Sequence, residues 1–122
     1  MSGQIPPQLQ NQIMQLQQLQ AQLQALQGQK IQLESMLREN EDALEELNKA
    51  KDDEIVYKSV GEILVKSTKD DAIKELVDKK ETMNIRKQTL DRQEERLQKR
   101  LTQLQEQIQG ILGGLGANQG EA

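Results

Sequence analysis

The 122-residue chain contains no cysteine, histidine, phenylalanine or tryptophan, and Tyr57 is its one aromatic residue. The lack of cysteine excludes disulfides, thiolate chemistry and cysteine-ligated metals. Without histidine or cysteine, no Ser–His or Cys–His nucleophile pair can be drawn. The many carboxylates would lie in water on thin helices, which suits them poorly to general acid–base catalysis. We therefore expect no enzyme, no cofactor and no metal site.

Long apolar runs and signal-like segments are also missing. No stretch approaches the ~20 apolar residues of a membrane span, and the opening MSGQIPPQLQ lacks the basic and apolar regions of a secretory signal. The glycine-rich segment 110–120 has no preceding strand and no following Lys-Ser/Thr, so it is not a phosphate loop. We expect a cytoplasmic protein without a nucleotide site.

The formal net charge is −4, and the charges are unevenly placed. Residues 1–29 contain no charged side chain, whereas residues 34–54 are strongly acidic. The basic residues of the second half alternate with acidic ones, so a solvated or partner-facing helix surface is favoured over nucleic-acid binding.

Two seven-residue apolar repeats mirror each other across Val60–Gly61. The a and d positions of an antiparallel coiled coil pair with each other, and here the paired numbers add to 120. The predicted pairs are Leu9–Ile111, Leu16–Leu104, Leu19–Leu101, Leu23–Leu97, Leu44–Leu76 and Leu47–Ile73. The chain is therefore predicted to be mainly α, a long antiparallel two-helix coiled coil with a β-hairpin at its bend.

The element boundaries follow from local signals within a single domain, 1–122. A first helix is expected over 8–51, a hairpin over 54–67, a second helix over 69–112 and a disordered tail over 113–122. Ser67 or Thr68 would cap the second helix, and Gly61 would supply the positive φ of the hairpin turn.

Several seam positions are polar: Lys30, Asn40, Lys80, Lys87 and Glu94. They could form a hinge or a polar channel. We favour control of the helix register, because a polar residue at a or d fixes alignment at some cost in stability.

The expected hairpin is apolar on both faces, with Ile55, Tyr57 and Leu64 on one and Val56, Val60, Ile63 and Val65 on the other. A two-stranded hairpin is marginal alone and leaves two bare edges. We expect hairpins of other chains to pair with it.

The two helix ends far from the bend form a second candidate surface. Their apolar residues exceed what one seam can bury, and no charges surround them: Ile5, Leu9, Ile13, Ile108, Ile111, Leu112 and Leu115. These seven, called the tip residues below, could simply finish the seam. We favour weak, unselective binding of exposed apolar polypeptide, because an uncharged rim imposes little electrostatic selectivity.

The hairpin sequence Val56-Tyr57-Lys58-x-Val60-Gly61, followed by Leu64-Val65-Lys66, resembles the prefoldin family. So do Ile5-Pro6-Pro7-Gln8 and the run from Leu90 to Glu94. Only one hairpin fits between Asp52 and Thr68, and this resembles the archaeal beta type, since alpha-type subunits carry two.

This resemblance implies a hexamer of two alpha-type and four beta-type subunits. The hairpins would join into a double β-barrel, through the assembly residues Ile55, Val56, Tyr57, Val60, Gly61, Ile63, Leu64 and Val65 of this chain. The tips of six coiled-coil arms would capture unfolded proteins without ATP and pass them to a group II chaperonin. The alternative is a structural coiled-coil scaffold subunit that binds one defined folded partner.

Overall fold

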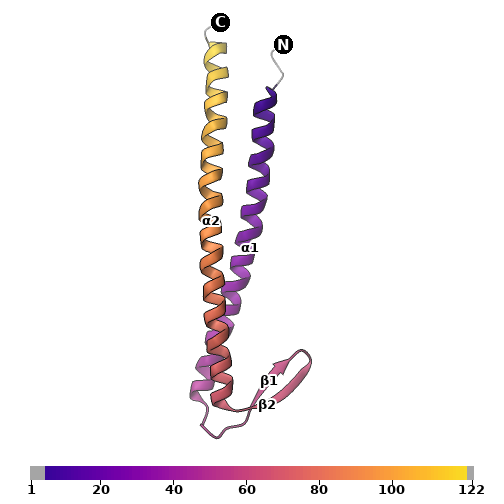
Figure 1. Cartoon of the computed structure of the whole chain (residues 1–122), viewed down its shortest axis with the longest axis vertical. Helices are drawn as coiled ribbons and strands as arrows, with labels where there is room; N and C mark the ends of the chain where they lie inside the picture. Colours follow the sequence, from indigo (N-terminus) through magenta and orange to yellow (C-terminus); the bar gives the residue numbers. More distant parts are fainter. Residues whose placement is uncertain (1–4, 121–122) are drawn as a thin grey trace. The chain divides into compact units, whose positions relative to one another are not determined.

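The computed structural model describes residues 5–120, and the side chains of residues 5–114. Its elements run in the order α1 (Pro7–Lys49), β1 (Val56–Val60), β2 (Ile63–Ser67) and α2 (Lys69–Gly120) (Figure 1). Two long helices flanking an antiparallel hairpin confirm the predicted fold class. Helix α1 begins at a proline, which the first turn tolerates because its N–H would have no intrahelical partner.

Helix α2 is longer than predicted. It continues to Gly120, eight residues beyond the expected end at Leu112, so the disordered tail predicted for 113–122 is corrected to helix as far as Gly120. Residues 121 and 122 lie outside the described part. A helical glycine costs roughly 1 kcal/mol relative to alanine but keeps its backbone N–H, whereas proline removes that donor. No proline follows Pro7 in the sequence, so the hydrogen-bond ladder is not interrupted.

The chain divides into two compact units, and each contains a segment of both helices. We call Met1–Gly28 with Leu90–Ala122 the terminal unit, and Gln29–Thr89 the central unit. The hairpin belongs to the central unit.

The terminal unit has a continuous apolar core between α1 and α2. Five residues form its buried centre, and five partly buried ones pack against them: Leu9, Leu19, Leu101, Leu104 and Ile108, then Ile13, Leu16, Leu23, Leu97 and Ile111. This core contains both members of all four pairs predicted for this part of the chain. A hydrogen bond from Gln12 Nε2 to Gln107 Oε1, 3.4 Å long, joins the same helices within one residue of the predicted register.

The helix pair of the central unit buries a polar residue. Asn40 is 6% exposed, and its Nδ2 donates to the main-chain oxygen of Leu76 at 3.1 Å. Its Oδ1 is buried without a partner. The Lys80 ammonium lies instead 3.7 Å from Glu41 at the surface, as expected for a long stem that carries its charge to water. These contacts favour register control at this position.

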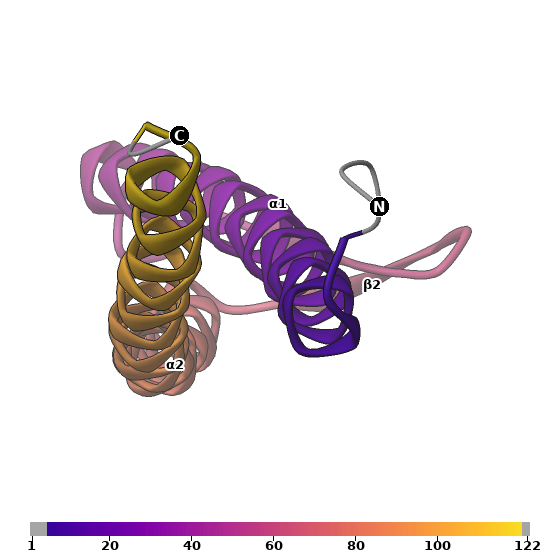
Figure 2. The ribbon, with the colours of Figure 1, turned by 90° about the horizontal axis from the view of Figure 1, so that it is seen from above.

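The hairpin turns tightly at Gly61. Val60 pairs with Ile63, so the loop is the two residues Gly61 and Glu62. Gly61 has a φ of 61°, and no other residue type in the described chain has a positive φ. A positive φ at the first loop position alone is the type II′ geometry, which matches strand twist. The hairpin extends away from the helix ends to which it is joined (Figure 2).

Candidate functional site

The start of α2 is capped by a threonine. The backbone N–H of Asp71 donates to Thr68 Oγ1 at 3.2 Å, which satisfies one of the free donors at the helix start. The sequence left Ser67 and Thr68 as alternatives. The structure selects Thr68, because Ser67 is the last residue of β2.

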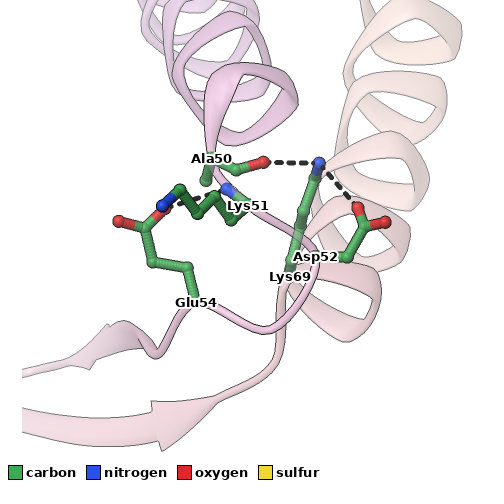
Figure 3. Close-up of polar contacts among 5 residues, drawn as sticks. All are labelled: Ala50, Lys51, Asp52, Glu54 and Lys69. Carbon is green, nitrogen blue, oxygen red and sulfur yellow. Dashed lines mark hydrogen bonds and ion pairs between the residues drawn. The ribbon is translucent and has the colours of Figure 1, made fainter.

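Lys69, the first residue of α2, forms hydrogen bonds to the residues that follow α1, at the base of the hairpin (Figure 3). Its Nζ donates to the main-chain oxygen of Ala50 at 2.8 Å and to Asp52 Oδ1 at 3.3 Å. Its side chain is only 13% exposed. Nearby, the N–H of Lys51 donates to Glu54 Oε2 at 3.0 Å. The lysine thus caps the carboxyl end of α1, where carbonyl groups lack helical partners and a cation is favoured.

The strand register assigns the hairpin side chains to faces. Residues opposite each other in an antiparallel pair share a face, and neighbours along a strand alternate. The register therefore places Tyr57 with Leu64, and Val56 and Val60 with Ile63 and Val65, as predicted. Tyr57, Ile63 and Leu64 are 63%, 67% and 69% exposed. Both faces consequently present apolar surface to solvent.

An ion pair connects the hairpin to α2 within the central unit. Lys58 Nζ contacts Glu75 Oε1, and the two side chains are 43% and 38% exposed. This hydrogen bond, aided by the charges of Lys58 and Lys79 and opposed by desolvation, lowers the pKa of Glu75 from its ordinary value. Lys58 projects from the face that carries Val56 and Val65, so the pair holds that face relative to α2.

The tip residues separate into three groups by exposure. Leu9 and Ile108 are buried in the terminal core, at 2% and 8% exposure. Ile13 and Ile111 are partly buried against it. Ile5 and Leu112 are 48% and 51% exposed. Leu115 lies in α2, but its side chain is outside the described residues. The seam thus accounts for part of the set, and Ile5 and Leu112 remain available to a partner.

Glutamine amides lie among these apolar residues. Gln12 Nε2 donates to Gln107 Oε1, while Gln12 Oε1 is buried without a hydrogen-bond partner. Gln10 Nε2 donates to the main-chain oxygen of Ile5 at 3.1 Å. The exposed apolar groups of this surface are therefore bordered by neutral amides, both paired and unpaired.

Sequence reasoning missed one exposed apolar residue of the terminal unit. Met14 is 60% exposed and lies in α1 between the seam residues Ile13 and Leu16. An apolar side chain outside the a and d positions was the available signal. The same signal would have indicated Ile31 and Ile85 in the central unit, which are 66% and 60% exposed.

A metal site and a membrane span each place requirements on the described residues. Within residues 5–120, no group of three or more acidic, histidine or cysteine side chains could hold a metal ion. In the same part of the chain, neither helix has a stretch apolar enough to cross a bilayer. The side-chain grooves are open, and the larger ones follow the helices; one in the central unit is lined by Met36 and Met83.

The sequence and the fold are similar to those of known proteins. A family model described as "Prefoldin subunit" matches residues 10–114. "Prefoldin subunit beta" of Methanococcoides burtonii is 54% identical over 95% of this chain and 99% of its own length. The protein of the same name from Archaeoglobus fulgidus is 56% identical over 90% of this chain and 95% of its own.

A solved structure extends this similarity to the fold. The crystal structure of the prefoldin beta subunit from Thermococcus strain KS-1 superposes with a TM-score of 0.82 and 44% identity, covering 89% of this chain and 96% of that one. The hairpin between two long helices, the sequence matches and this superposition agree, and the chain belongs to the prefoldin family.

Proposed function

We propose that this chain is a subunit of an ATP-independent chaperone that captures unfolded polypeptides through the ends of its helices in the terminal unit. The observation that carries the proposal is the exposure of Ile5 and Leu112 beside a core that already buries Leu9 and Ile108. A client that covers apolar side chains beside a preformed core is bound more tightly, because each Å² of apolar surface removed from water lowers the binding free energy.

The surroundings of these residues favour unselective binding. Residues 5–29, which lead into and form the first part of α1, and residues 107–120 of α2 contain no charged side chain. A neutral surface neither attracts nor repels a client by its charge, so clients of many sequences can bind. The remaining tip residues, Ile13, Ile111 and Leu115, would extend the contact.

We propose that the chain has a second function, subunit assembly, and that the hairpin carries it. Both of its faces expose apolar side chains, and each strand pairs on one side only within the described residues. Hairpins of neighbouring subunits would cover these faces and edges, giving the double β-barrel of a hexamer with two alpha-type and four beta-type subunits. The membership of the prefoldin family supports this arrangement.

Assembly and capture are linked by avidity. One tip offers a small contact area and therefore weak binding, whereas several tips that hold one client raise its effective concentration. Each contact stays reversible, which permits release to a group II chaperonin in the cytoplasm without ATP hydrolysis. The chain itself would catalyse no reaction.

The capture proposal is tested by removing exposed apolar groups. The double variant Ile5→Ser with Leu112→Ser should lose most suppression of aggregation of a denatured model protein and keep its native mass. Ile85→Ser is the matched control, because it removes an exposed isoleucine from the central unit. Unchanged suppression by the double variant would refute the tip assignment. Saturable binding to one folded protein, with no effect on denatured ones, would instead support the scaffold alternative.

The assembly proposal has a separate readout. Tyr57→Asp with Leu64→Asp places two charges on one exposed hairpin face, where burial would be costly. Light scattering should report a fall in native mass in the presence of an alpha-type subunit. Ile85→Asp should leave the mass unchanged. An unaltered mass for the hairpin variant would contradict the assembly role.

A further inference from the structure

We propose that the terminal unit recognises the main chain of an extended polypeptide through the amide pair Gln12 and Gln107, in addition to its apolar contacts. This inference rests on the client-binding function proposed above. It names the substrate class of that site, which is polypeptide whose backbone N–H and C=O groups lack internal partners.

The amide pair is incompletely satisfied. Gln12 Nε2 donates to Gln107 Oε1 across 3.4 Å, longer than the usual range of an N–H···O hydrogen bond. Gln12 Oε1 is buried and accepts from no donor in the described structure. An unpaired buried acceptor is unfavourable. A donor that reaches this oxygen would therefore replace an unfavourable arrangement, and parting the amide pair would cost one weak bond.

A glutamine amide is chemically suited to pair with a backbone. It carries one carbonyl acceptor and two N–H donors, so it can accept from a client N–H and donate to a client C=O in either chain direction. The chain already contains one such contact. Gln10 Nε2 donates to the main-chain oxygen of Ile5, a residue that precedes helix α1.

The location of the pair links it to the apolar surface. Gln12 lies in α1 between Leu9 and Leu16, and Gln107 is adjacent in sequence to Ile108. Leu9 and Ile108 belong to the buried terminal core, and Leu16 packs against it. A client that covers this end can bury side chains and bring its backbone to the amides together. The nearest charge along α2 is Glu106, and α1 has none before Lys30.

Backbone pairing would separate unfolded chains from folded proteins. A folded protein with an exposed apolar patch pairs almost all of its buried backbone groups internally. An extended segment offers unpaired groups whatever its sequence. Apolar contact alone cannot distinguish an unfolded chain from a folded protein with an apolar patch. An amide pair can do so, because it binds the backbone and does not depend on the client's side chains.

The experiment compares two peptides that differ only in the backbone. One is a fluorescent peptide of leucine, valine and serine, and the other has esters in place of alternate amides, which removes N–H donors and keeps the side chains. Anisotropy with the full-length chain should give weaker binding of the ester peptide, by about five-fold, the factor supplied by one ordinary hydrogen bond. Gln12→Leu should bind both peptides equally.

The substitution separates backbone pairing from apolar contact, because leucine adds apolar area at the same point. Gln24→Leu is the matched control, since Gln24 is an exposed residue of α1 in the same unit, and it should keep the five-fold preference. Gln107→Leu, at an exposed position, repeats the test without altering a partly buried residue. Equal binding of both peptides to the unaltered chain, or tighter binding of the amide peptide to Gln12→Leu, would overturn the inference and leave client binding standing. Failure of the unaltered chain, assembled with an alpha-type subunit, to bind either peptide would overturn the proposed function as well.

Discussion

Replacing Asn40 by leucine should stabilise the central unit and weaken its helix register. Asn40 is 6% exposed and occupies a d position of the first repeat. One polar atom of its side-chain amide is hydrogen-bonded, since Nδ2 donates to the main-chain oxygen of Leu76 at 3.1 Å. The other polar atom, Oδ1, is buried without a hydrogen-bond partner. Leucine has the same number of side-chain heavy atoms and no polar group to satisfy.

The magnitude follows from three contributions. Burial of a leucine side chain contributes about 1.5–3 kcal/mol, and removal of an unpaired buried acceptor relieves about 1–3 kcal/mol. Loss of the bond to Leu76 costs about 0.5–1.5 kcal/mol. The lower ends of the two gains apply, because a seam between two helices covers only one side of each. The expected increase in unfolding free energy is about 2 kcal/mol.

A matched control removes the contribution of helix propensity. Asn84→Leu makes the same change at an exposed position of α2 in the central unit, so it gains only the few tenths of a kcal/mol by which leucine exceeds asparagine in a helix. Urea unfolding followed by circular dichroism measures the difference. The chain concentration must be constant across variants, because association contributes to apparent stability.

The register is measured separately with spin labels. The chain has no native cysteine, so Glu39→Cys with Thr82→Cys introduces a unique pair beside one groove of the central unit. One narrow distance distribution is expected with Asn40, and a broader one with leucine at that position, since a buried polar residue specifies alignment. If Asn40→Leu is less stable than the unaltered chain, the hydrogen bond to Leu76 outweighs the unpaired acceptor and the reasoning is wrong.

Three further predictions concern packing, the turn and pH. Leu101→Ala should destabilise the terminal unit by about 2–3 kcal/mol, which is typical for truncation of a buried leucine. Leu112→Ala should cost less than half as much, because Leu112 is 51% exposed. Hydrogen exchange in α1 measures both losses of stability, and equal losses would contradict the assignment of Leu101 to the buried seam. Gly61→Ala should cost about 1–2 kcal/mol in hairpin stability, because a φ of 61° strains an L-residue although no atom lies within 4 Å of the added carbon; amide exchange in the strands reports it, and unaltered protection would argue against the turn geometry. The bond from Lys58 lowers the pKa of Glu75, so this contact stabilises the fold above the carboxyl's ordinary pKa and is lost as pH falls through the lowered value; carboxyl NMR titration should detect the lowered pKa and its return upward in Lys58→Met, and no change in that variant would exclude the pairing.

Local patterns were sufficient for the architecture. Heptad positions predicted the Leu19–Leu101 and Leu23–Leu97 layers, because the period of apolar residues selects the face that a helix buries. Gly61 was predictable as the turn residue, since only glycine adopts a positive φ without strain. The end of α2 could not be predicted in this way. Helix propensity is a weak signal, and glycine lowers the propensity without removing the backbone donors that continue the helix.

The sequence by itself determined the two repeats, their antiparallel register and the hairpin between them, because each depends on periodicity or on one backbone conformation. Only the tertiary structure decided that Leu9 is buried while Ile5 is exposed, and that Asn40 bonds to Leu76. It alone showed that Lys69 caps the end of α1. The physical reason is that exposure and polar pairing depend on side chains brought together from distant parts of the chain. Periodicity assigns a residue to a face, but not to the atoms that it contacts there.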